Sequence, residues 1–384
     1  MSREFYIPKK VVYGANALTE AIPYIAKMGK KALIVTGKIV VTLDAFATLT
    51  DELEKNGVEY SVFTGITGEP TDTMINEGLA EYKKNNCDFL IGIGGGSPLD
   101  SIKAIAALSV CGGKISDYMG KTIDGKMPPM AAIPTTAGTG SEATQFTVIT
   151  DSEKDIKMLL KGSVLIPDIA VIDPKLSVSS PKTITAATGL DALTHAVESY
   201  TSRKAQPLTD SVSISAVKRI FKNLPTAYYD GNNLEARSEM AVAALEAGMA
   251  INNASVTIVH GMSRPIGVLF HVPHGMSNAM LLKKCMAFAA DGAADRFADL
   301  GRAIGAADKS DSDKLAADKF VDALGDICEK CEVPTLSEYG IDKQKFFDAM
   351  DKMADDALAS GSPSNTQKAV TKKDILNIYT SLWD

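Results

Sequence analysis

Short apolar runs alternate with amphipathic stretches through the first half of the chain. The runs cover residues 32–37, 59–65, 89–96, 129–136 and 167–173, and the first three end in glycine. Helix-like stretches over residues 43–55 and 71–86 lie between the first three runs. Continuous apolar runs separated by helices are typical of parallel strands covered by helices on both faces. This half is therefore predicted to be an α/β, doubly wound domain.

The pattern changes after Pro181. From residue 183 onward the chain is rich in alanine, and its apolar residues recur with helical spacing. The clearest examples are residues 208–225, 235–253 and 314–331. No strand-like alternation of useful length is visible there. We predict an α/β domain over residues 1–181 and an all-helical domain over residues 182–384.

Composition narrows the class of protein. A chain of 384 residues suits two domains, and 45% hydrophobic with 23% charged residues is typical of soluble globular proteins rather than disordered ones. The net charge of -7 lacks the basic excess that nucleic acids or acidic membranes attract. No apolar run reaches the roughly 18 to 20 residues that span a bilayer. The start, MSREFYIPKK, has no apolar segment of a secretory signal. We therefore expect a cytoplasmic protein without nucleic-acid or membrane partners.

Cysteine usage argues against a disulfide framework. The chain has five cysteines, an odd and small number for its length. Cys328 and Cys331 form a C-x-x-C, which raises the alternatives of a redox or zinc site. They lie in a helix-like stretch without a second C-x-x-C or a nearby histidine. We interpret them as two thiols on a helix.

Two glycine-rich segments follow predicted strands. Gly94, Gly95, Gly96 and Ser97 precede a helix that is expected to begin near Pro98. Glycines let a phosphate approach the backbone, and helix N-termini bind anions. The segment matches neither G-x-G-x-x-G nor a Walker A loop, so by itself it fits a tight turn as well as a ligand loop. Residues 134–142 form a second Gly/Thr cluster after a strand. Two such loops predict a Rossmann-like nucleotide-binding domain.

The histidines are clustered. All four lie between residues 195 and 274. Asp191 and His195 are four residues apart and therefore share one helix face, either by chance or as half of a metal site. His260 is expected to close an apolar helix, and His274 to open a new segment. Two or three imidazoles with one carboxylate suit Fe²⁺ or Zn²⁺ rather than Mg²⁺ or Ca²⁺.

Four sequence blocks carry a family resemblance. They are GGGSPLDSIKAIA (94–106), IPTTAGTGSEAT (133–144), GLDALTHAVESY (189–200) and HGM…VPHGMSNAMLL (260–282). In order and spacing they resemble the iron-containing (group III) alcohol dehydrogenases, and the resemblance spans the whole chain. It implies an NAD(P)-linked enzyme that interconverts small aldehydes and alcohols, and a homo-oligomer that is a dimer or larger.

The resemblance also implies roles for individual residues. The metal ligands, for Fe²⁺ or Zn²⁺, fall on Asp191, His195, His260 and His274. The cofactor, NAD(H) or NADP(H), is expected at the N-terminal domain, and the second domain is expected to bind the metal. Cofactor-binding positions fall on Gly37, Gly94, Gly95, Gly96, Ser97, Asp100, Thr135, Thr136, Thr139 and Lys157, the last close to the ribose.

Two positions depart from the family pattern. Many NAD-preferring members carry an aspartate where this chain has Gly37, followed by Lys38. That carboxylate binds ribose hydroxyls and repels a 2′-phosphate, so its absence leaves both NAD and NADP open. The second departure is Arg264, where the family often has a histidine four residues after the first histidine ligand of this segment.

Arg264 bears on catalysis and on the substrate. A guanidinium cannot act as a general base at neutral pH, so His271, solvent or the ribose would relay the proton. Arg264 lies one helical turn beyond His260 and offers a charged fork for a carboxylate, sulfonate or phosphonate. Alternatively, it turns aside to pair with a helix carboxylate. The hypothesis is a short anionic aldehyde such as succinic semialdehyde or sulfoacetaldehyde.

Metal-assisted hydride transfer is the mechanism that these parts predict, because a bound divalent ion polarises a carbonyl or an alkoxide and the nicotinamide carries the hydride. A non-redox, nucleotide-dependent metalloenzyme is the alternative, such as a lyase of the related dehydroquinate synthase type. A purely structural or binding module is a third interpretation, and it offers no reason for one aspartate and three histidines at matched positions.

Overall fold

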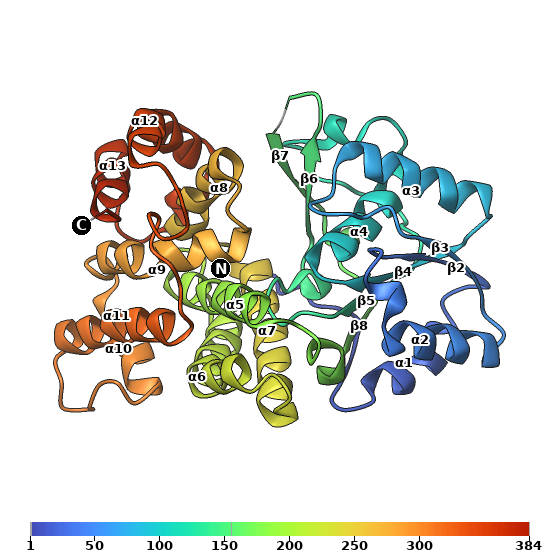
Figure 1. Ribbon diagram of the computed structural model, residues 1–384, viewed down its shortest axis with the longest axis horizontal. Coiled ribbons are helices and arrows are strands. Elements are labelled where there is room, and N and C mark those ends of the chain that lie inside the picture. The colour runs from blue at the N-terminus through green and yellow to red at the C-terminus, as the bar shows by residue number, and fades with distance from the viewer. Residues whose placement is uncertain (1, 155, 384) are drawn as a thin grey trace. The chain divides into compact units, whose positions relative to one another are not determined.

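Residues 6–179 fold around a parallel sheet of six strands in the order β1-β8-β5-β4-β2-β3. The computed structural model describes residues 2–154 and 156–383, so the predicted domain ends at residues 1 and 384 lie outside the described residues (Figure 1). The strands are β1 (Lys10–Tyr13), β2 (Lys31–Val35), β3 (Glu59–Phe63), β4 (Phe89–Gly94), β5 (Met130–Pro134) and β8 (Ile169–Ile172). The five predicted apolar runs all contain strands of this sheet, which confirms the α/β expectation.

Helices cover both faces of the sheet. They are α1 (Ala17–Ile25), α2 (Asp44–Lys55), α3 (Asp72–Lys84) and α4 (Gly96–Cys111), with short 3₁₀ turns at Val40–Thr42, Ile115–Tyr118, Ser141–Ala143, Ser163–Leu165 and Pro174–Ser177. On β2, Ala32 and Ile34 pack in one apolar cluster with α1 and α2, whereas Leu33 and Val35 pack in a second cluster with α3 and α4. Successive residues of a strand point to opposite faces, so an uninterrupted apolar run is what two covered faces require.

Three strands of this unit were not predicted. The edge strand β1 has only four residues and is partly exposed, so its sequence KVVY carries little signal. Strands β6 (Phe146–Asp151) and β7 (Ile156–Lys161) form a separate antiparallel hairpin, and apolar residues stand at both its buried and its exposed positions, so no clean alternation marks it in the sequence. The helix expected near Pro98 begins earlier, at Gly96, after Gly94 turns the chain with φ of 147°.

Residues 180–383, together with residues 2–5, form a second unit. Its helices are α5 (Lys182–Thr201), α6 (Pro207–Tyr229), α7 (Leu234–Ala254), α8 (Ile258–Phe270), α9 (His274–Ala290), α10 (Ala294–Ala303), α11 (Asp313–Lys330), α12 (Lys343–Ala359) and α13 (Lys372–Ser381), with a 3₁₀ turn at Ser362–Asn365. Helix α5 packs against α6, α7 and α9 and is buried on all sides from residue 189 to its end. The helical second half is thereby confirmed.

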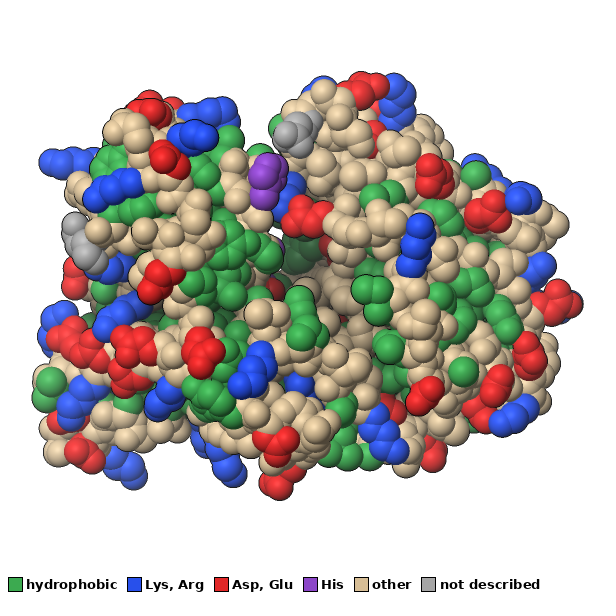
Figure 2. Space-filling view, in the orientation of Figure 1, with side chains coloured by type: hydrophobic (Ala, Val, Ile, Leu, Met, Phe, Trp, Pro, Cys, Tyr) green, Lys and Arg blue, Asp and Glu red, His purple; other side chains and the backbone are tan. Residues whose placement is uncertain are grey.

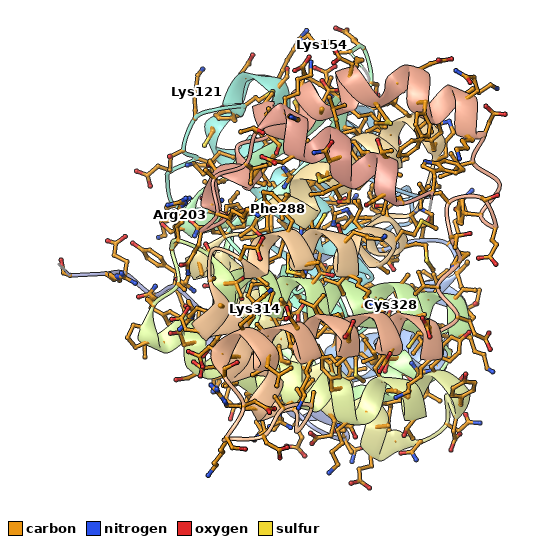
Figure 3. All side chains as sticks on the ribbon, turned by 90° about the vertical axis from the view of Figure 1, so that its left-hand side faces the viewer. Lys121, Lys154, Arg203, Phe288, Lys314 and Cys328 are labelled. Carbon is orange, nitrogen blue, oxygen red and sulfur yellow. The ribbon has the colours of Figure 1, made fainter. Side chains whose placement is uncertain are left out.

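The cysteines agree with the expectation from composition. All five cysteines are free thiols, and Cys328 lies near the end of α11, where Figure 3 labels it together with Lys314 at the start of that helix. Burial raises the pKa of Cys328 and of Cys331 to about 12, so both are protonated at neutral pH. Figure 2 shows basic and acidic side chains interspersed over the visible face.

No single helix among residues 2–154 and 156–383 has the length and hydropathy to cross a membrane. The pair α7 and α8 meets that test only when taken together, by length and composition, and it is bent by 105°.

Candidate metal centre and cofactor loops

Three helices of the second unit bring one carboxylate and three imidazoles together. Asp191 and His195 lie one turn apart on α5, His260 lies on α8, and His274 is the first residue of α9. The Oδ1 atom of Asp191 lies 3.7 Å from the Nε2 atom of each of the three histidines. One atom from each residue belongs to a set in which all atoms lie within 4.8 Å of one another. The four predicted ligands therefore converge.

The spacing of these atoms fits a tetrahedral metal ion. Bonds of about 2.0 to 2.2 Å to nitrogen and oxygen place tetrahedral ligands about 3.4 Å apart. The 3.7 Å between Asp191 and each imidazole is slightly wider, and the whole set lies within 4.8 Å, so the imidazoles would move inward to bind one ion. The rings of His195 and His260 are stacked, with centroids 4.6 Å apart and planes inclined by 19°. Three imidazoles and one carboxylate form a donor set that suits Fe²⁺ or Zn²⁺.

The ionised carboxylate of the cluster also suits a cation. Burial by itself would raise the pKa of Asp191, but the charges of His195 and His274 and the hydrogen bond from His260 outweigh it and hold that pKa well below its usual range. Burial would lower the pKa of His260, but the Glu198 carboxylate outweighs it and raises this pKa to about 9. Asp191 therefore stays ionised in the buried site.

One expectation about His260 is wrong. The residue does not close an apolar helix; it lies in the first turn of α8. Ser255 adopts a φ of 64°, which ends α7 at Ala254 and redirects the chain before α8 begins.

Glu198 is a functional candidate that was not predicted. It is fully buried on α5, and its Oε2 lies 2.5 Å from Nδ1 of His260. Asp191, His195 and Glu198 stand at positions i, i+4 and i+7, so they share one face of a helix. Three ionisable residues along one face of an alanine-rich, buried helix were the signal that was available.

Asn278 was also missed. It lies one turn after His274 on α9, and its Nδ2 donates a hydrogen bond of 2.8 Å to Asp191 Oδ1. The same Nδ2 lies 3.2 Å from Nε2 of His260 and 3.3 Å from Nε2 of His274. The amide thus contacts three of the four candidate ligand atoms and orients the carboxylate.

Arg264 lies on α8, one turn beyond His260, as predicted. Its Nη1 donates to the hydroxyl of Ser362 at 3.2 Å. Among the described residues no carboxylate forms an ion pair with this guanidinium, so the alternative in which it turns aside to a helix carboxylate is wrong. Burial lowers the pKa of Arg264, and the nearby charge of Glu198 opposes that shift.

His271 caps the C-terminal end of α8. It is exposed and adopts the left-handed conformation, with φ of 53°. The element that carries it also carries His260 and Arg264. Its role as a proton relay stays a prediction.

The two glycine-rich loops lie side by side in the first unit. They follow β4 and β5, which pair in parallel with Gly94 beside Pro134, and the backbone N–H of Thr135 donates to Gly94 O at 2.8 Å. An added Cβ on Gly96 would lie 2.9 Å from Thr139 Cγ2. This close approach requires glycine and places the N-terminus of α4 beside the threonine loop.

Asp100, on α4, connects the region of these loops to strand β6. Its Oδ2 accepts from the backbone N–H of Val148 at 2.8 Å, so this oxygen holds the β6 strand. Lys103 is fully buried, 3.7 Å from Asp100 Oδ1, and donates to Thr144 Oγ1 and Phe146 O. Burial raises the pKa of the neighbouring Glu142 to about 7.

Gly37 and Lys157 lie on the same unit. Gly37 follows β2, and an added Cβ there would lie 3.0 Å from the carbonyl oxygen of Ile66. Lys157, on β7, forms an ion pair of 2.7 Å with Glu69. The ribose contacts expected of both residues stay predictions.

Comparison with known proteins covers both units. The family described as "Iron-containing alcohol dehydrogenase" matches residues 8–174, and "Fe-containing alcohol dehydrogenase family, C-terminal" matches residues 185–383. The 1,3-propanediol dehydrogenase of Citrobacter freundii is 35% identical over 383 residues, or 98% of this chain and 97% of that protein.

Two solved structures share the fold over the full length. A 1,3-propanediol oxidoreductase has a TM-score of 0.96 at 33% identity, with 100% of both chains covered. Sulfoacetaldehyde reductase from Bifidobacterium kashiwanohense in complex with NAD⁺ has a TM-score of 0.89 at 29% identity, covering 100% of this chain and 99% of that one.

Proposed function

Because the chain belongs to the iron-containing alcohol dehydrogenase family, we propose that it is a metal-dependent, NAD(P)-linked enzyme that interconverts a short-chain aldehyde and its primary alcohol. At the coarser level it is an oxidoreductase that acts on alcohols or aldehydes. The observation that carries the proposal is the convergence of Asp191 Oδ1 on three imidazole Nε2 atoms at 3.7 Å. The match of both units to alcohol dehydrogenase families favours this activity over the lyase alternative.

The residues of each unit have distinct tasks in this proposal. Asp191, His195, His260 and His274 would hold Fe²⁺ or Zn²⁺, which, when bound, supplies Lewis acidity towards the substrate oxygen. Asp191 contributes the one negative charge among the four ligands, and Asn278 orients it. At the start of α4, residues 94–97 offer backbone N–H groups and the helix dipole to the cofactor pyrophosphate.

Metal removal and reconstitution test the proposal. The protein is stripped with a chelator, reloaded with Fe²⁺ or Zn²⁺, and assayed by NADH and NADPH absorbance with a panel of short aldehydes. We expect turnover only after reloading, and we expect His260→Ala to retain little bound metal by elemental analysis. Full turnover in a demonstrably metal-free preparation would contradict the proposal.

The substrate is proposed to be a short aldehyde with an anionic tail, such as succinic semialdehyde or sulfoacetaldehyde. Arg264 supports this choice, because its guanidinium is half-buried and pairs with no carboxylate of the described residues. The likeness to a sulfoacetaldehyde reductase is in line with it. An anionic group of the substrate would pair with a guanidinium whose side-chain hydrogen bond, within the described part of the chain, goes to the Ser362 hydroxyl.

Arg264→Ala separates this substrate class from neutral aldehydes. Losing a partly buried charge pair costs about 2 to 5 kcal/mol, so KM for the anionic aldehyde should rise roughly 30-fold or more. KM for propanal should hardly change, and propanal is therefore the matched control. Equal penalties for both aldehydes would remove Arg264 from the substrate site.

Assembly and location complete the proposal. We propose a cytoplasmic homo-oligomer, a dimer or larger. Strand β1 supports the oligomer, because it forms one edge of the sheet and carries Tyr13, whose relative exposure is 69%. Light scattering coupled to size exclusion measures the assembly directly, and a monomeric mass would contradict it.

A further inference from the structure

Glu198 is a fully buried carboxylate with partners at both oxygens. Its Oε2 lies 2.5 Å from Nδ1 of His260. Its Oε1 accepts from the hydroxyl of Thr257 at 2.8 Å and from the backbone N–H of Val259 at 2.7 Å. The residue stands on α5 one turn after His195, so it approaches the start of α8 from a different helix.

The first of its two tasks concerns the start of α8. The first N–H groups of a helix have no partner within the helix, and Thr257 at the N-cap makes no side-chain bond to its own helix. Glu198 Oε1 accepts from Val259 instead, and its negative charge complements the positive end of the helix dipole. Glu198 therefore fixes the turn that carries His260.

The second task concerns the proton on the imidazole. An ionised carboxylate only accepts hydrogen bonds, so Nδ1 of His260 must carry the hydrogen that lies between the two groups. In the neutral imidazole that binds a metal, Nε2 then keeps its lone pair, and Nε2 is the atom that lies 3.7 Å from Asp191 Oδ1. We propose that Glu198 is a positioning residue that selects Nε2 as the metal-binding atom of His260 and holds the ring towards the metal. This proposal rests on the metal site of the proposed function.

Glu198→Gln separates the two tasks. The amide oxygen must take the place of Oε1, because the hydroxyl of Thr257 and the N–H of Val259 both donate there. The amide NH₂ then faces Nδ1 and can only donate, which moves the imidazole proton to Nε2 and removes the lone pair from the metal site. The start of α8 keeps its acceptor, whereas the choice of ligand atom is reversed.

Metal affinity is the primary measurement. Competition with a chromophoric chelator gives the Kd for Zn²⁺ of the full-length wild type and of each variant. We expect Glu198→Gln to raise this Kd by about 10- to 100-fold. Glu246→Gln is the matched control with an unchanged Kd, because Glu246 is a largely buried carboxylate on α7 that pairs with Ser215 and Arg219 rather than with a histidine.

A second measurement needs no variant. The chain has only four histidines, so long-range ¹H–¹⁵N correlation spectra of the Zn²⁺-loaded wild type are simple to assign. We expect His260 to carry a slowly exchanging proton on Nδ1 and to bind the metal through Nε2. This spectrum decides the proposal even if Glu198→Gln fails to fold.

The outcomes distinguish this proposal from the proposed function. Metal bound through Nδ1 of His260, or a folded Glu198→Gln variant with the wild-type Kd, overturns the role of Glu198 and leaves the enzyme assignment intact. A wild type that binds no Zn²⁺, or whose Kd is indifferent to His260→Ala, overturns the metal site itself and this proposal with it.

Discussion

Replacing Lys103 with methionine should destabilise the unit of residues 6–179 strongly. Lys103 lies in the middle of α4 with no solvent exposure. Its Nζ donates to the carbonyl oxygen of Phe146 at 2.8 Å and to the hydroxyl of Thr144 at 3.0 Å, and it lies 3.7 Å from Asp100 Oδ1. Methionine keeps an unbranched side chain that is one heavy atom shorter, and it removes the charge and all three N–H donors.

The magnitude follows from the groups that are left behind. Removing one member of a buried ion pair costs about 3 to 5 kcal/mol. Burial already raises the pKa of Asp100 and lowers the pKa of Lys103, so part of that penalty is relieved when Asp100 takes up a proton. The unpaired Phe146 carbonyl and Thr144 hydroxyl add about 1 to 3 kcal/mol. We expect a loss of about 3 to 5 kcal/mol in the free energy of unfolding.

The control is a lysine on the surface of the same unit. Lys154, labelled in Figure 3, pairs with Asp151 at 3.4 Å, but its side chain is 66% exposed. Exposed pairs contribute about 0 to 1 kcal/mol, so Lys154→Met should change little. The double variant Asp100→Asn/Lys103→Met should recover part of the loss, because it leaves no charge of this pair unpartnered.

The assay must report on the correct unit. The single tryptophan, Trp383, lies in the other unit, so its fluorescence does not follow the unfolding of residues 6–179. Urea unfolding followed by circular dichroism, with hydrogen exchange at β4 and β5, does follow it. A loss below about 1 kcal/mol for Lys103→Met, equal to that of Lys154→Met, would refute the view that Lys103 joins α4 to the loops and the hairpin.

Three further predictions concern charge and metal. Burial raises the pKa of Glu142 from 4.5 to about 7, so the stability that its protonated form contributes is full below pH 4.5 and is lost as pH rises through 7. In urea titrations, Glu142→Gln should remove a pH dependence on the order of 3 kcal/mol from the free energy of unfolding. Gly37→Asp should shift the kcat/KM ratio towards NAD, whereas Gly37→Asn, equally crowded by the Ile66 carbonyl, should not; equal ratios would place Gly37 away from the ribose. Zn²⁺ at 100 times its Kd should stabilise the wild type by about 2.7 kcal/mol, which thermal unfolding detects as a rise in Tm; the same Zn²⁺ concentration should leave the Tm of His274→Ala unchanged.

Buried strands were predictable from sequence, and exposed ones were not. The strands around Ile34, Ile91 and Ile133 are almost entirely apolar, because both faces of the sheet are covered there. The hairpin of β6 and β7 alternates buried with exposed positions and mixes lysine with leucine, which a helix also does. Its position depends on pairing with itself and on Asp100, and neither contact is visible as local periodicity.

The metal ligands were predictable, but their supporting residues were not. Asp191 and His195 share a helix face at a spacing that sequence reveals, and a family resemblance joins them to His260 and His274. Glu198 and Asn278 act through partners on other helices, at Oε2 to His260 and at Nδ2 to Asp191. Such contacts depend on how α5, α8 and α9 pack, and packing between distant segments leaves no fixed spacing in the chain.

Helix α5 itself argues that this site exists for a ligand. The helix is buried on all sides from residue 189 onward, so every ionisable group on it loses hydration. A core that needed only stability would place apolar residues at these positions, since well-packed hydrophobic groups replace a buried ion pair without loss. Instead, Asp191 faces three imidazoles, and Glu198 holds one of those imidazoles from behind. Glu198 also holds the start of α8, which the protein needs without any ligand. Among the described residues, Asp191 faces three imidazoles and accepts a hydrogen bond from the Asn278 amide, an arrangement that a divalent cation explains and packing does not.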